Sequence, residues 1–440
     1  MRAELEVTVS EALKIVLDAV GPVRTSRAEI PYCVGSVLAE PIKARWDVPP
    51  LDNSAMDGFA VRSCDLANAT PENPGTLDVI ESLPAGRMAA KAVRDGSAIR
   101  IMTGAPIPGG ADAVVPIEDV VVDGNRIVIS HTVQPRTHIR LAGEDVKSGD
   151  EVLLPGTVLS PAAVGMLASL GCKTVLVHRQ PQVSVLSTGD ELVDVDGDRS
   201  GGRIIASNTY SLSAQILQCG ARPIIAEIAG DTATSIEERI AEIRGADVMV
   251  TSGGVSMGDY DLVIPVLESL GCKILFNSVK MRPGHPTTFG VLDGKPVFAL
   301  PGNPVSCMVA FEQFVRPVLL RMMGHTQIHR PTVRARLTHN LRQKPGRLSF
   351  IRALVTATPD GLLVSATGSQ SSGVLTSMVR ANGLLLFPRD MSEMPVGHEA
   401  EVQIIDSGFW QVYAAARYGF TGADAATAQA SAAATLSGKP

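Results

Sequence analysis

The chain contains 440 residues, of which 45% are hydrophobic, 19% charged and 4% aromatic, and it carries a formal net charge of -6 at pH 7. This composition predicts a globular protein of roughly three domains and excludes a disordered one. A net negative charge and few aromatic side chains also argue against a large nucleic-acid-binding surface, which needs a basic face or stacking platforms.

The six cysteines lie far apart in the sequence and include no Cys-X-X-Cys pair. This spacing predicts neither a zinc framework nor a disulfide scaffold, and it favours a reducing compartment. Residues 1–7 lack a signal-peptide pattern, and no stretch approaches the roughly 18 consecutive apolar residues of a membrane helix. We therefore expect a cytoplasmic protein that binds neither nucleic acid nor membrane.

Residues 8–20 have the period of an amphipathic helix, with Thr8 and Glu11 at the spacing of a capping box. Residues 45–60 then form a proline-bounded segment rich in small polar side chains, Asp57 among them. Loops of this kind often carry function, although a series of Asx turns has the same composition.

Short strands and turns follow from about residue 61 to residue 140, with an Asp-Gly hairpin signal at residues 123–124. This pattern predicts a small β-rich domain. Ser160 and Pro161 then occupy the N-cap and first positions of a predicted helix.

Residues 181–325 alternate short apolar runs with helical patterns. This alternation predicts a mostly parallel sheet with helices on both faces. Ligands bind such sheets at the carboxyl ends of the strands. Four segments should therefore share one rim, namely Ser187–Glu191, Gly230–Asp231, Ser252–Asp261 and Pro301–Ser306.

Carboxylates occupy three of these segments, at Asp190, Glu191, Asp231, Asp259 and Asp261. Together they could hold a hard cation, for which Mg²⁺ is the natural candidate. Asp231 could equally cap the helix that follows it.

Two glycine-containing loops and one basic turn suit an anion. Gly253 and Gly254 follow an apolar strand, where backbone N–H groups can approach a phosphate, although a plain strand–turn–helix connection has the same residues. Gly302 and Asn303 directly precede a predicted helix N-terminus. The basic turn carries Lys280, Arg282 and His285 around Pro283-Gly284.

Residues 331–406 return to β character, with five strands at the spacing of a small barrel or sandwich. After Trp410 the composition is dominated by Ala, Ser, Thr and Gly, which predicts a disordered tail.

In six of its segments the chain resembles the MoeA family of molybdopterin molybdenumtransferases, which includes the E domains of gephyrin-type proteins. They follow the family order over nearly the whole chain to about residue 406. The segments are Asp52–Ala60 (DNSAMDGFA), Ile101–Pro106 (IMTGAP), Gly143–Val146 (GEDV), Ser187–Leu192 (STGDEL), Thr251–Asp261 (TSGGVSMGDYD) and Leu300–Ser306 (LPGNPVS).

The resemblance implies an α/β multidomain fold. Its domains are a discontinuous helical linker domain at 1–45 and 144–180, an inserted β-rich domain at 46–143, a doubly wound, adenylyltransferase-like domain with a mostly parallel sheet at 181–327, and a C-terminal β-barrel at 328–407, followed by a disordered tail at 408–440. It also implies an elongated homodimer with the active site in a cleft between the subunits.

The implied reaction takes adenylylated molybdopterin and molybdate, releases AMP in a Mg²⁺-dependent step and inserts molybdenum at the dithiolene. The implied Mg²⁺ ligands are Glu191, Asp231, and Asp259 or Asp261. The implied catalytic residues are Asp57, Thr103, Asp231 and Arg282. The implied substrate-binding residues are Ser252, Gly253, Gly254, Val255, Ser256, His285, Gly302, Asn303, Ser306, Arg347 and Ser372.

One departure from the family concerns the basic turn, which is commonly Lys-Pro-Gly-Lys-Pro but here reads Arg282-Pro-Gly-His285-Pro. Arg keeps the charge with a forked donor set, whereas His is charged only part of the time at pH 7. Oxyanion affinity can therefore differ, and the turn is compatible with molybdate or tungstate.

Two other functions compete with the molybdenum insertase. A molybdopterin adenylyltransferase has the fold expected for residues 181–325, but it would not need the other domains. A non-catalytic, gephyrin-like scaffold would not need the rim carboxylates. The expected macromolecular partners are a second copy of the chain, the adenylyltransferase and molybdoenzyme maturation proteins.

Overall fold

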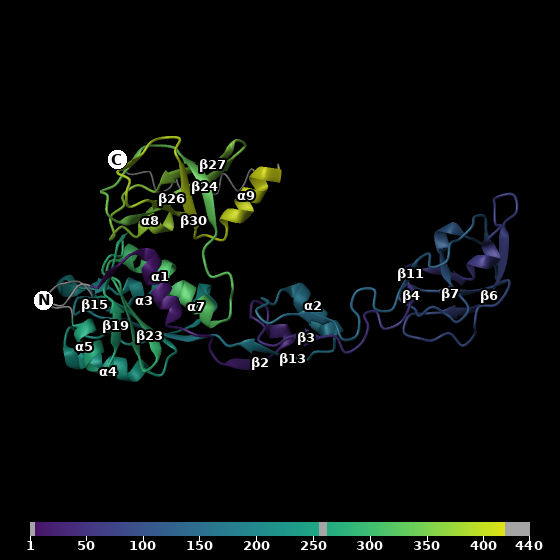
Figure 1. Ribbon diagram of the computed structural model, residues 1–440, viewed down its shortest axis with the longest axis horizontal. Coiled ribbons are helices and arrows are strands. Elements are labelled where there is room, and N and C mark those ends of the chain that lie inside the picture. The colour runs from purple at the N-terminus through teal and green to yellow at the C-terminus, as the bar shows by residue number, and fades with distance from the viewer. Residues whose placement is uncertain (1–4, 255–261, 419–440) are drawn as a thin grey trace. The chain divides into compact units, whose positions relative to one another are not determined.

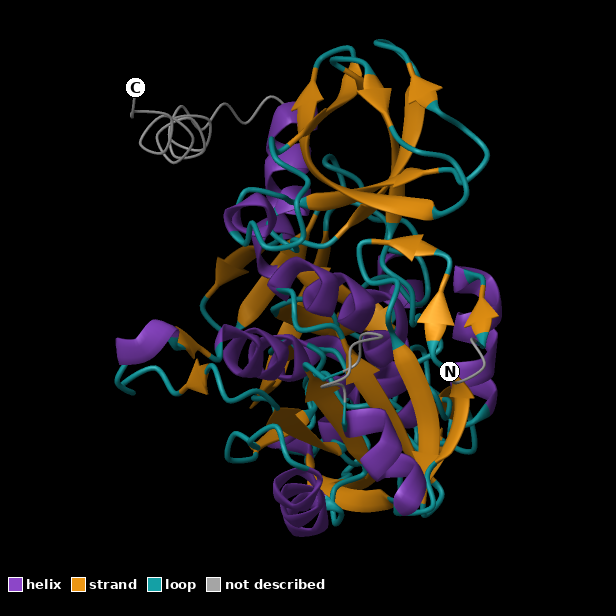
Figure 2. Ribbon diagram, turned by 90° about the vertical axis from the view of Figure 1, so that its left-hand side faces the viewer, coloured by secondary structure: helices purple, strands orange, loops and turns teal. Residues whose placement is uncertain are grey.

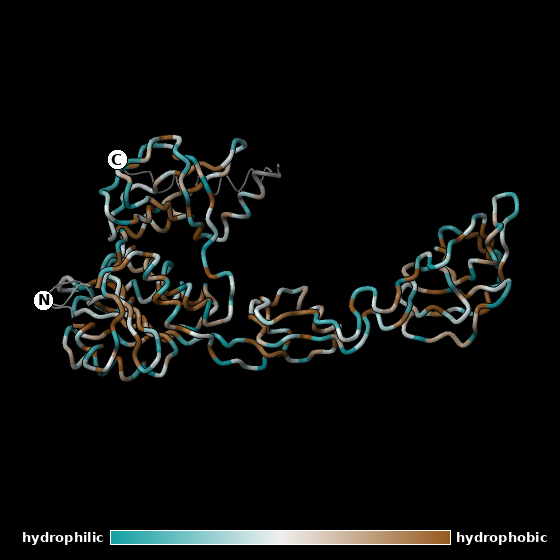
Figure 3. Tube along the Cα trace, viewed as in Figure 1, coloured by the Kyte–Doolittle hydropathy of each residue, from teal (hydrophilic) through white to brown (hydrophobic). Residues whose placement is uncertain are grey.

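The computed structural model describes residues 5–254 and 262–418. The chain divides into two compact units, drawn in Figure 1: unit 1 comprises Met1–Ser26 and His178–Pro440, and unit 2 comprises Arg27–Val177. Hydrophobic stretches follow the strands of each unit in Figure 3. Among the described residues, no helix is long and apolar enough to cross a membrane.

A six-stranded sheet forms the centre of unit 1. Its strand order is β17 (Arg222–Ile225), β14 (Gln182–Ser187), β18 (Val248–Ser252), β23 (Lys295–Leu300), β22 (Thr288–Leu292) and β19 (Lys273–Phe276). The first four strands run parallel, and the last two each pair antiparallel with the strand before them. The parallel strands cover the four apolar runs that predict a parallel sheet, whereas no prediction covers β19 or β22.

Helices lie on both faces of this sheet (Figure 2). They are α3 (Ser207–Gln218), α4 (Ala233–Ile243), α5 (Val263–Ser269) and α6 (Pro304–Ala310). Because side chains alternate along a strand, Val185 and Leu186 of β14 point to opposite faces. Val185 packs with α3 and α6 in one hydrophobic cluster, and Leu186 packs with α4 and α5 in another. A π-helical segment, η5 (Phe311–Val315), continues α6 into α7 (Arg316–Met322).

The first helix, α1 (Val9–Asp18), begins at the predicted capping box. Thr8 N donates to Glu11 Oε2 at 2.8 Å, and Glu11 N donates to Thr8 Oγ1 at 3.3 Å. The helix buries Ala12 and Val16 in the core of unit 1, beside η5 and α7. The predicted linker domain includes residues 1–45, so its boundary is corrected: the apolar face of α1 ties the first 26 residues to unit 1.

The C-terminal part of unit 1 is a closed five-stranded barrel, seen as a ring of strands in Figure 2. Its strands are, in order around the barrel, β26 (Leu348–Thr358), β27 (Gly361–Ala366), β24 (Thr332–Leu337), β30 (Glu399–Ile404) and β28 (Gly383–Phe387). Pairing of β28 with β26 closes the ring, which decides between the barrel and the sandwich.

The predicted disordered tail, residues 408–440, begins too early. Residues Phe409–Tyr418 form α9, and Phe409 is buried in the barrel core, which gives this segment an apolar anchor that its composition does not reveal. Residues 419–440 lie outside the described part of the chain.

Unit 2 contains a second six-stranded sheet, which forms the predicted β-rich region. Its strands are, in order, β8 (Ala113–Pro116), β5 (Gly58–Val61), β7 (Ser97–Ile101), β6 (Gly75–Leu83), β10 (Arg126–Ile129) and β9 (Val121–Asp123). Strands β9 and β10 pair as the hairpin predicted at Asp123-Gly124.

The rest of unit 2 is not predominantly helical, contrary to the linker domain that the resemblance implies. In the described chain it has one α-helix, α2 (Pro161–Ser169), which starts at the predicted Ser160 cap. Short strand pairs make up most of the remaining regular structure: β2 (Thr25–Glu29) with β13 (Thr174–His178), β3 (Ile42–Lys43) with β12 (Glu151–Leu153), and β4 (Asn53–Ser54) with β11 (Ile139–Arg140). The intervening segments are too short and too rich in glycine and proline for longer helices.

The placement of α1 predicts which unit responds to a core substitution. Val16→Ala removes two buried methyl groups and should lower the free energy of unfolding of unit 1 by about 1–3 kcal/mol. The two tryptophans report on different units, because Trp46 lies in unit 2 and Trp410 in unit 1. In denaturant titrations of single-tryptophan variants, V16A should shift the Trp410 transition and leave the Trp46 transition unchanged. A shift confined to Trp46 would contradict the placement of α1.

Candidate functional site

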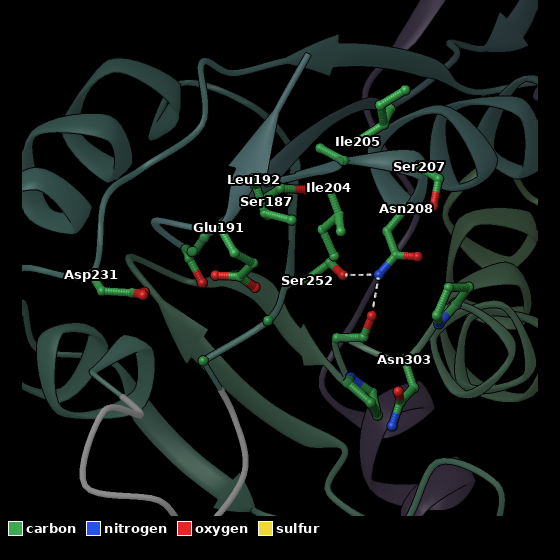
Figure 4. A pocket seen from close by; sticks show the side chains of 18 of the residues that line it. Ser187, Glu191, Leu192, Ile204, Ile205, Ser207, Asn208, Asp231, Ser252 and Asn303 are labelled. Carbon is green, nitrogen blue, oxygen red and sulfur yellow. Dashed lines mark hydrogen bonds between the residues drawn. The ribbon is translucent and has the colours of Figure 1, made fainter. Parts of the chain in front are cut away.

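A cavity of about 530 Å³ opens where the parallel strands of unit 1 end. Strands β14, β18 and β23 are in register there, with Ser187 opposite Ser252 and Ser252 opposite Leu300. All four segments predicted to share the rim contribute to its lining (Figure 4). The lining residues are Ser187, Thr188, Gly189, Glu191, Leu192, Ile204, Ile205, Ala206, Ser207, Asn208, Asp231, Ser252, Gly253, Gly254, Pro286, Pro301, Gly302, Asn303 and Pro304.

The glycine loop after β18 requires its glycines. Gly253 and Gly254 have φ values of 99° and 63°, in the left-handed region. A Cβ on Gly253 would lie 2.7 Å from the Thr188 carbonyl oxygen, and one on Gly254 would lie 2.7 Å from Val263 Cγ2. The loop therefore presents bare backbone to the cavity, as expected of a site for a phosphate.

Carboxylates gather at one end of the cavity, where Figure 4 shows Glu191 and Asp231 close together. Asp190 N donates to Asp231 Oδ2 at 3.1 Å, and Asp231 N donates to Asp190 Oδ1 at 3.0 Å. Asp231 is not the cap of α4, because the N-cap is Thr232, whose hydroxyl accepts from Ser235 N. The alternative role for Asp231 is thus removed, and the carboxylate pair is fixed at the rim.

Oxygen donors of this kind suit Mg²⁺. In the described part of the chain, no group of three or more His, Cys, Asp or Glu side chains is placed to hold a metal ion. The predicted ligands Asp259 and Asp261, and the predicted binding residues Val255 and Ser256, lie outside the described residues.

Asn208 of α3 occupies the opposite end of the cavity, and no sequence prediction included it. Its Nδ2 donates to Ser252 Oγ at 2.8 Å and to the Gly302 carbonyl oxygen at 2.7 Å. The side chain thereby joins the ends of β18 and β23. The available signal was a polar residue in the first turn of a helix that starts at the same rim.

The basic turn lies beside the first turn of α6. A Cβ on Gly284 would lie 3.5 Å from the Ser306 carbonyl oxygen, and Pro286 lines the cavity. His285 is half-buried, with Nδ1 2.8 Å from the Val279 carbonyl oxygen and 3.9 Å from Glu6 Oε1. Unlike the family lysine, His285 therefore uses one ring nitrogen within its own turn.

The barrel brings two more predicted residues to the same region. Strand β21 (Met281–Arg282) pairs with β26, which places Arg282 opposite Ser349 and near Arg347. Val305 N of α6 donates to the Ser372 carbonyl oxygen at 3.1 Å. The structure thus brings Arg282, Arg347 and Ser372 around the start of α6.

Arg352 is a second residue that the sequence analysis missed. It is 1% exposed, and burial lowers the pKa of its guanidinium to about 10. Its Nε donates to Ser377 Oγ and its Nη2 to the Ser371 carbonyl oxygen, both at 3.2 Å. Arg352 therefore holds the segment that carries Ser372, and an arginine inside an apolar strand was the available signal.

The predicted facing loop lies in unit 2, where the structure brings Asp57 and Thr103 together. Thr103 donates to Asp57 Oδ1 through its hydroxyl at 2.6 Å and through its backbone N–H at 2.7 Å. These two hydrogen bonds, the hydroxyl one first, hold the pKa of Asp57 below its ordinary value. The contact spans 46 residues of sequence, so it is more than a local Asx turn.

Comparison with known proteins covers almost the same length of chain as the six motifs. Residues 7–171 match the family model for the MoeA N-terminal region, residues 184–321 that for a probable molybdopterin-binding domain, and residues 334–405 that for the MoeA C-terminal region.

Individual relatives agree with these matches. A molybdopterin molybdenumtransferase of Nostoc sp. is 39% identical over 361 residues, which cover 80% of this chain and 83% of that protein. One of Staphylococcus aureus is 34% identical over 402 residues, which cover 91% and 96%. The crystal structure of a molybdopterin biosynthesis moeA protein from Pyrococcus horikoshii aligns with a TM-score of 0.77 at 32% identity, over 90% of this chain and 99% of that one.

The contact between Asp57 and Thr103 makes a prediction about pH. Thr103→Val removes the hydroxyl donor and keeps the backbone one, so the pKa of Asp57 should rise towards its ordinary value. Asp57 would then take up a proton at a higher pH than in the wild type, which a carboxyl NMR titration can follow. Thr137→Val, which removes a hydroxyl bonded to the Gln134 carbonyl oxygen, should leave the titration of Asp57 unchanged. An unchanged midpoint in T103V would contradict this assignment.

Proposed function

The chain belongs to the MoeA family, and we propose that it is a molybdopterin molybdenumtransferase. In this role it takes adenylylated molybdopterin and molybdate, releases AMP and inserts molybdenum at the dithiolene. The observation that carries the proposal is the strand-end cavity, which combines carboxylates, bare glycine backbone and a neighbouring basic turn.

The carboxylate end of the cavity is the proposed Mg²⁺ site. Glu191 and Asp231 would hold the ion, and the reciprocal bonds between Asp190 and Asp231 would keep the ligands at the rim. When bound, Mg²⁺ would offset the repulsion between these carboxylates and the substrate phosphates and would polarise the phosphoanhydride.

The remaining residues divide the substrates between them. The backbone of Ser252–Gly254 and Gly302–Asn303 would receive the phosphates, because no Cβ prevents their approach at the glycines. Arg282, with Ser306, His285, Arg347 and Ser372 nearby, would attract the molybdate oxyanion. A forked guanidinium suits an oxyanion because it can donate two parallel hydrogen bonds.

The two competing functions are not favoured. A molybdopterin adenylyltransferase would account for residues 184–321 but not for the matches at residues 7–171 and 334–405. A non-catalytic scaffold would need neither the paired rim carboxylates nor the strained glycine loop.

Release of AMP tests this function. Purified protein supplied with adenylylated molybdopterin, Mg²⁺ and molybdate should release AMP, and release should require both the metal ion and the oxyanion. Asp231→Ala should slow it on the order of a hundredfold or more, because a charged metal ligand is lost. Chromatographic measurement of AMP is sufficient.

The control for D231A is Glu237→Gln, which removes an exposed carboxylate from α4. It should leave both AMP release and the circular dichroism spectrum unchanged. Intact substrate after incubation with the wild-type protein would overturn the insertase function, and normal turnover by D231A would remove Asp231 from the site.

We further propose that two copies of the chain complete each site, with Asp57 and Thr103 of one copy serving the cavity of the other. The proposal is supported by the paired Asp57 and Thr103, which match the family's facing loop but lie in unit 2 rather than unit 1.

Mixing two inactive variants tests the shared site. Asp57→Asn and Asp231→Ala should each be inactive alone. After subunit exchange, about a quarter of the wild-type activity should return, because half the random dimers then carry one intact site. A D57N/D231A double variant, mixed with either single variant, is the matched control and should restore nothing. No recovery with the two single variants, despite exchange shown by mass spectrometry, would contradict a shared site.

A further inference from the structure

Asn208 is bound on one side and unsatisfied on the other. Its side chain is 9% exposed and lines the cavity. Both hydrogens of Nδ2 are used, by Ser252 Oγ and by the Gly302 carbonyl oxygen, as the dashed lines in Figure 4 show. Within the described chain, the buried Oδ1 accepts no hydrogen bond.

The orientation of the amide follows from its neighbours. A carbonyl oxygen can only accept, so the atom that faces Gly302 must be the nitrogen of Asn208. Turning the amide over would set two acceptors against each other. Oδ1 is therefore held in place, and a buried acceptor without a donor is unfavourable.

We propose that Asn208 is a substrate-binding residue whose Oδ1 accepts a hydrogen bond from an N–H donor of the bound substrate's nitrogen heterocycle. The inference rests on the proposed function, since adenylylated molybdopterin carries such donors on both its pterin and its adenine. The same oxygen would repel a phosphate oxygen. A heterocycle therefore lies at the Asn208 end of the cavity, and the phosphates lie towards the glycine loops and the carboxylates.

Asn208 also positions the floor of the cavity. Its two Nδ2 bonds join the last residue of β18 to the loop after β23, so the glycines of both loops keep a fixed separation. Binding and positioning thus come from opposite ends of one amide.

Equilibrium binding of adenylylated molybdopterin, without molybdate, tests the inference independently of turnover. Asn208→Leu keeps the size of the side chain but removes both functions of the amide, and its affinity should fall about ten- to hundredfold. Asn208→Ser, a smaller polar change, covers the case in which N208L does not fold and should also bind more weakly. Separate titrations with AMP and with molybdopterin identify the source of the N–H donor, because only that ligand's affinity should fall.

Gln215 provides a matched control on the same helix. It is 7% exposed, and its Nε2 donates to the Met308 carbonyl oxygen at 3.2 Å and to Glu312 Oε1 at 2.9 Å. Its buried Oε1 likewise has no partner among the described residues, but it does not line the cavity. Gln215→Leu should therefore lower the melting temperature, as N208L does, and bind the substrate with wild-type affinity.

The possible results separate the inference from the function on which it rests. Wild-type affinity in N208L and N208S, or an equal loss in Q215L, would overturn the role of Asn208. If wild-type protein binds the substrate through Asn208 but releases no AMP, the insertase function fails and the binding role stands. If wild-type protein does not bind adenylylated molybdopterin at all, both fail.

Discussion

Parallel pairing of β14, β18 and β23 is the constraint on which the site depends. The register sets Ser187 beside Ser252 and Ser252 beside Leu300, so three strands end at the same level. Each strand then releases its loop into the same space, because parallel strands present their carboxyl ends to one edge of the sheet. Residues separated by more than a hundred positions in the sequence thereby share one cavity.

Close approach of these loops is possible only because several positions lack a side chain. Gly253 and Gly254 fit against Thr188 and Val263 at distances that no Cβ could occupy. The same absence exposes backbone to the ligand, so packing and binding place one demand on the sequence. The strained conformation is stabilised by neighbours on both sides, including the Asn208 amide that holds Ser252.

Local chemistry made most of the fold predictable. The capping box at Thr8, the Ser160 cap and the apolar runs of β14 and β18 each depend on residues close in sequence, and each is confirmed. Features that depend on distant partners were missed or misplaced. The helix α1 joined unit 1 because its apolar face meets η5 and α7, and α9 formed because Phe409 enters the barrel. Asn208 and Arg352 gain their roles from partners far along the chain.

The two sheets of unit 1 differ in whether they have free edges. The barrel closes on itself through β28 and β26, so no row of backbone groups is left for another chain to pair with. The mixed sheet is open at β17, where Ile224 and Ile225 are 38% and 53% exposed. Pro223 stands in this edge strand and carries no N–H group, which interrupts the row of donors that strand addition requires. One ring residue thus protects against misassembly an edge that, unlike the barrel's strands, has no partner within its sheet.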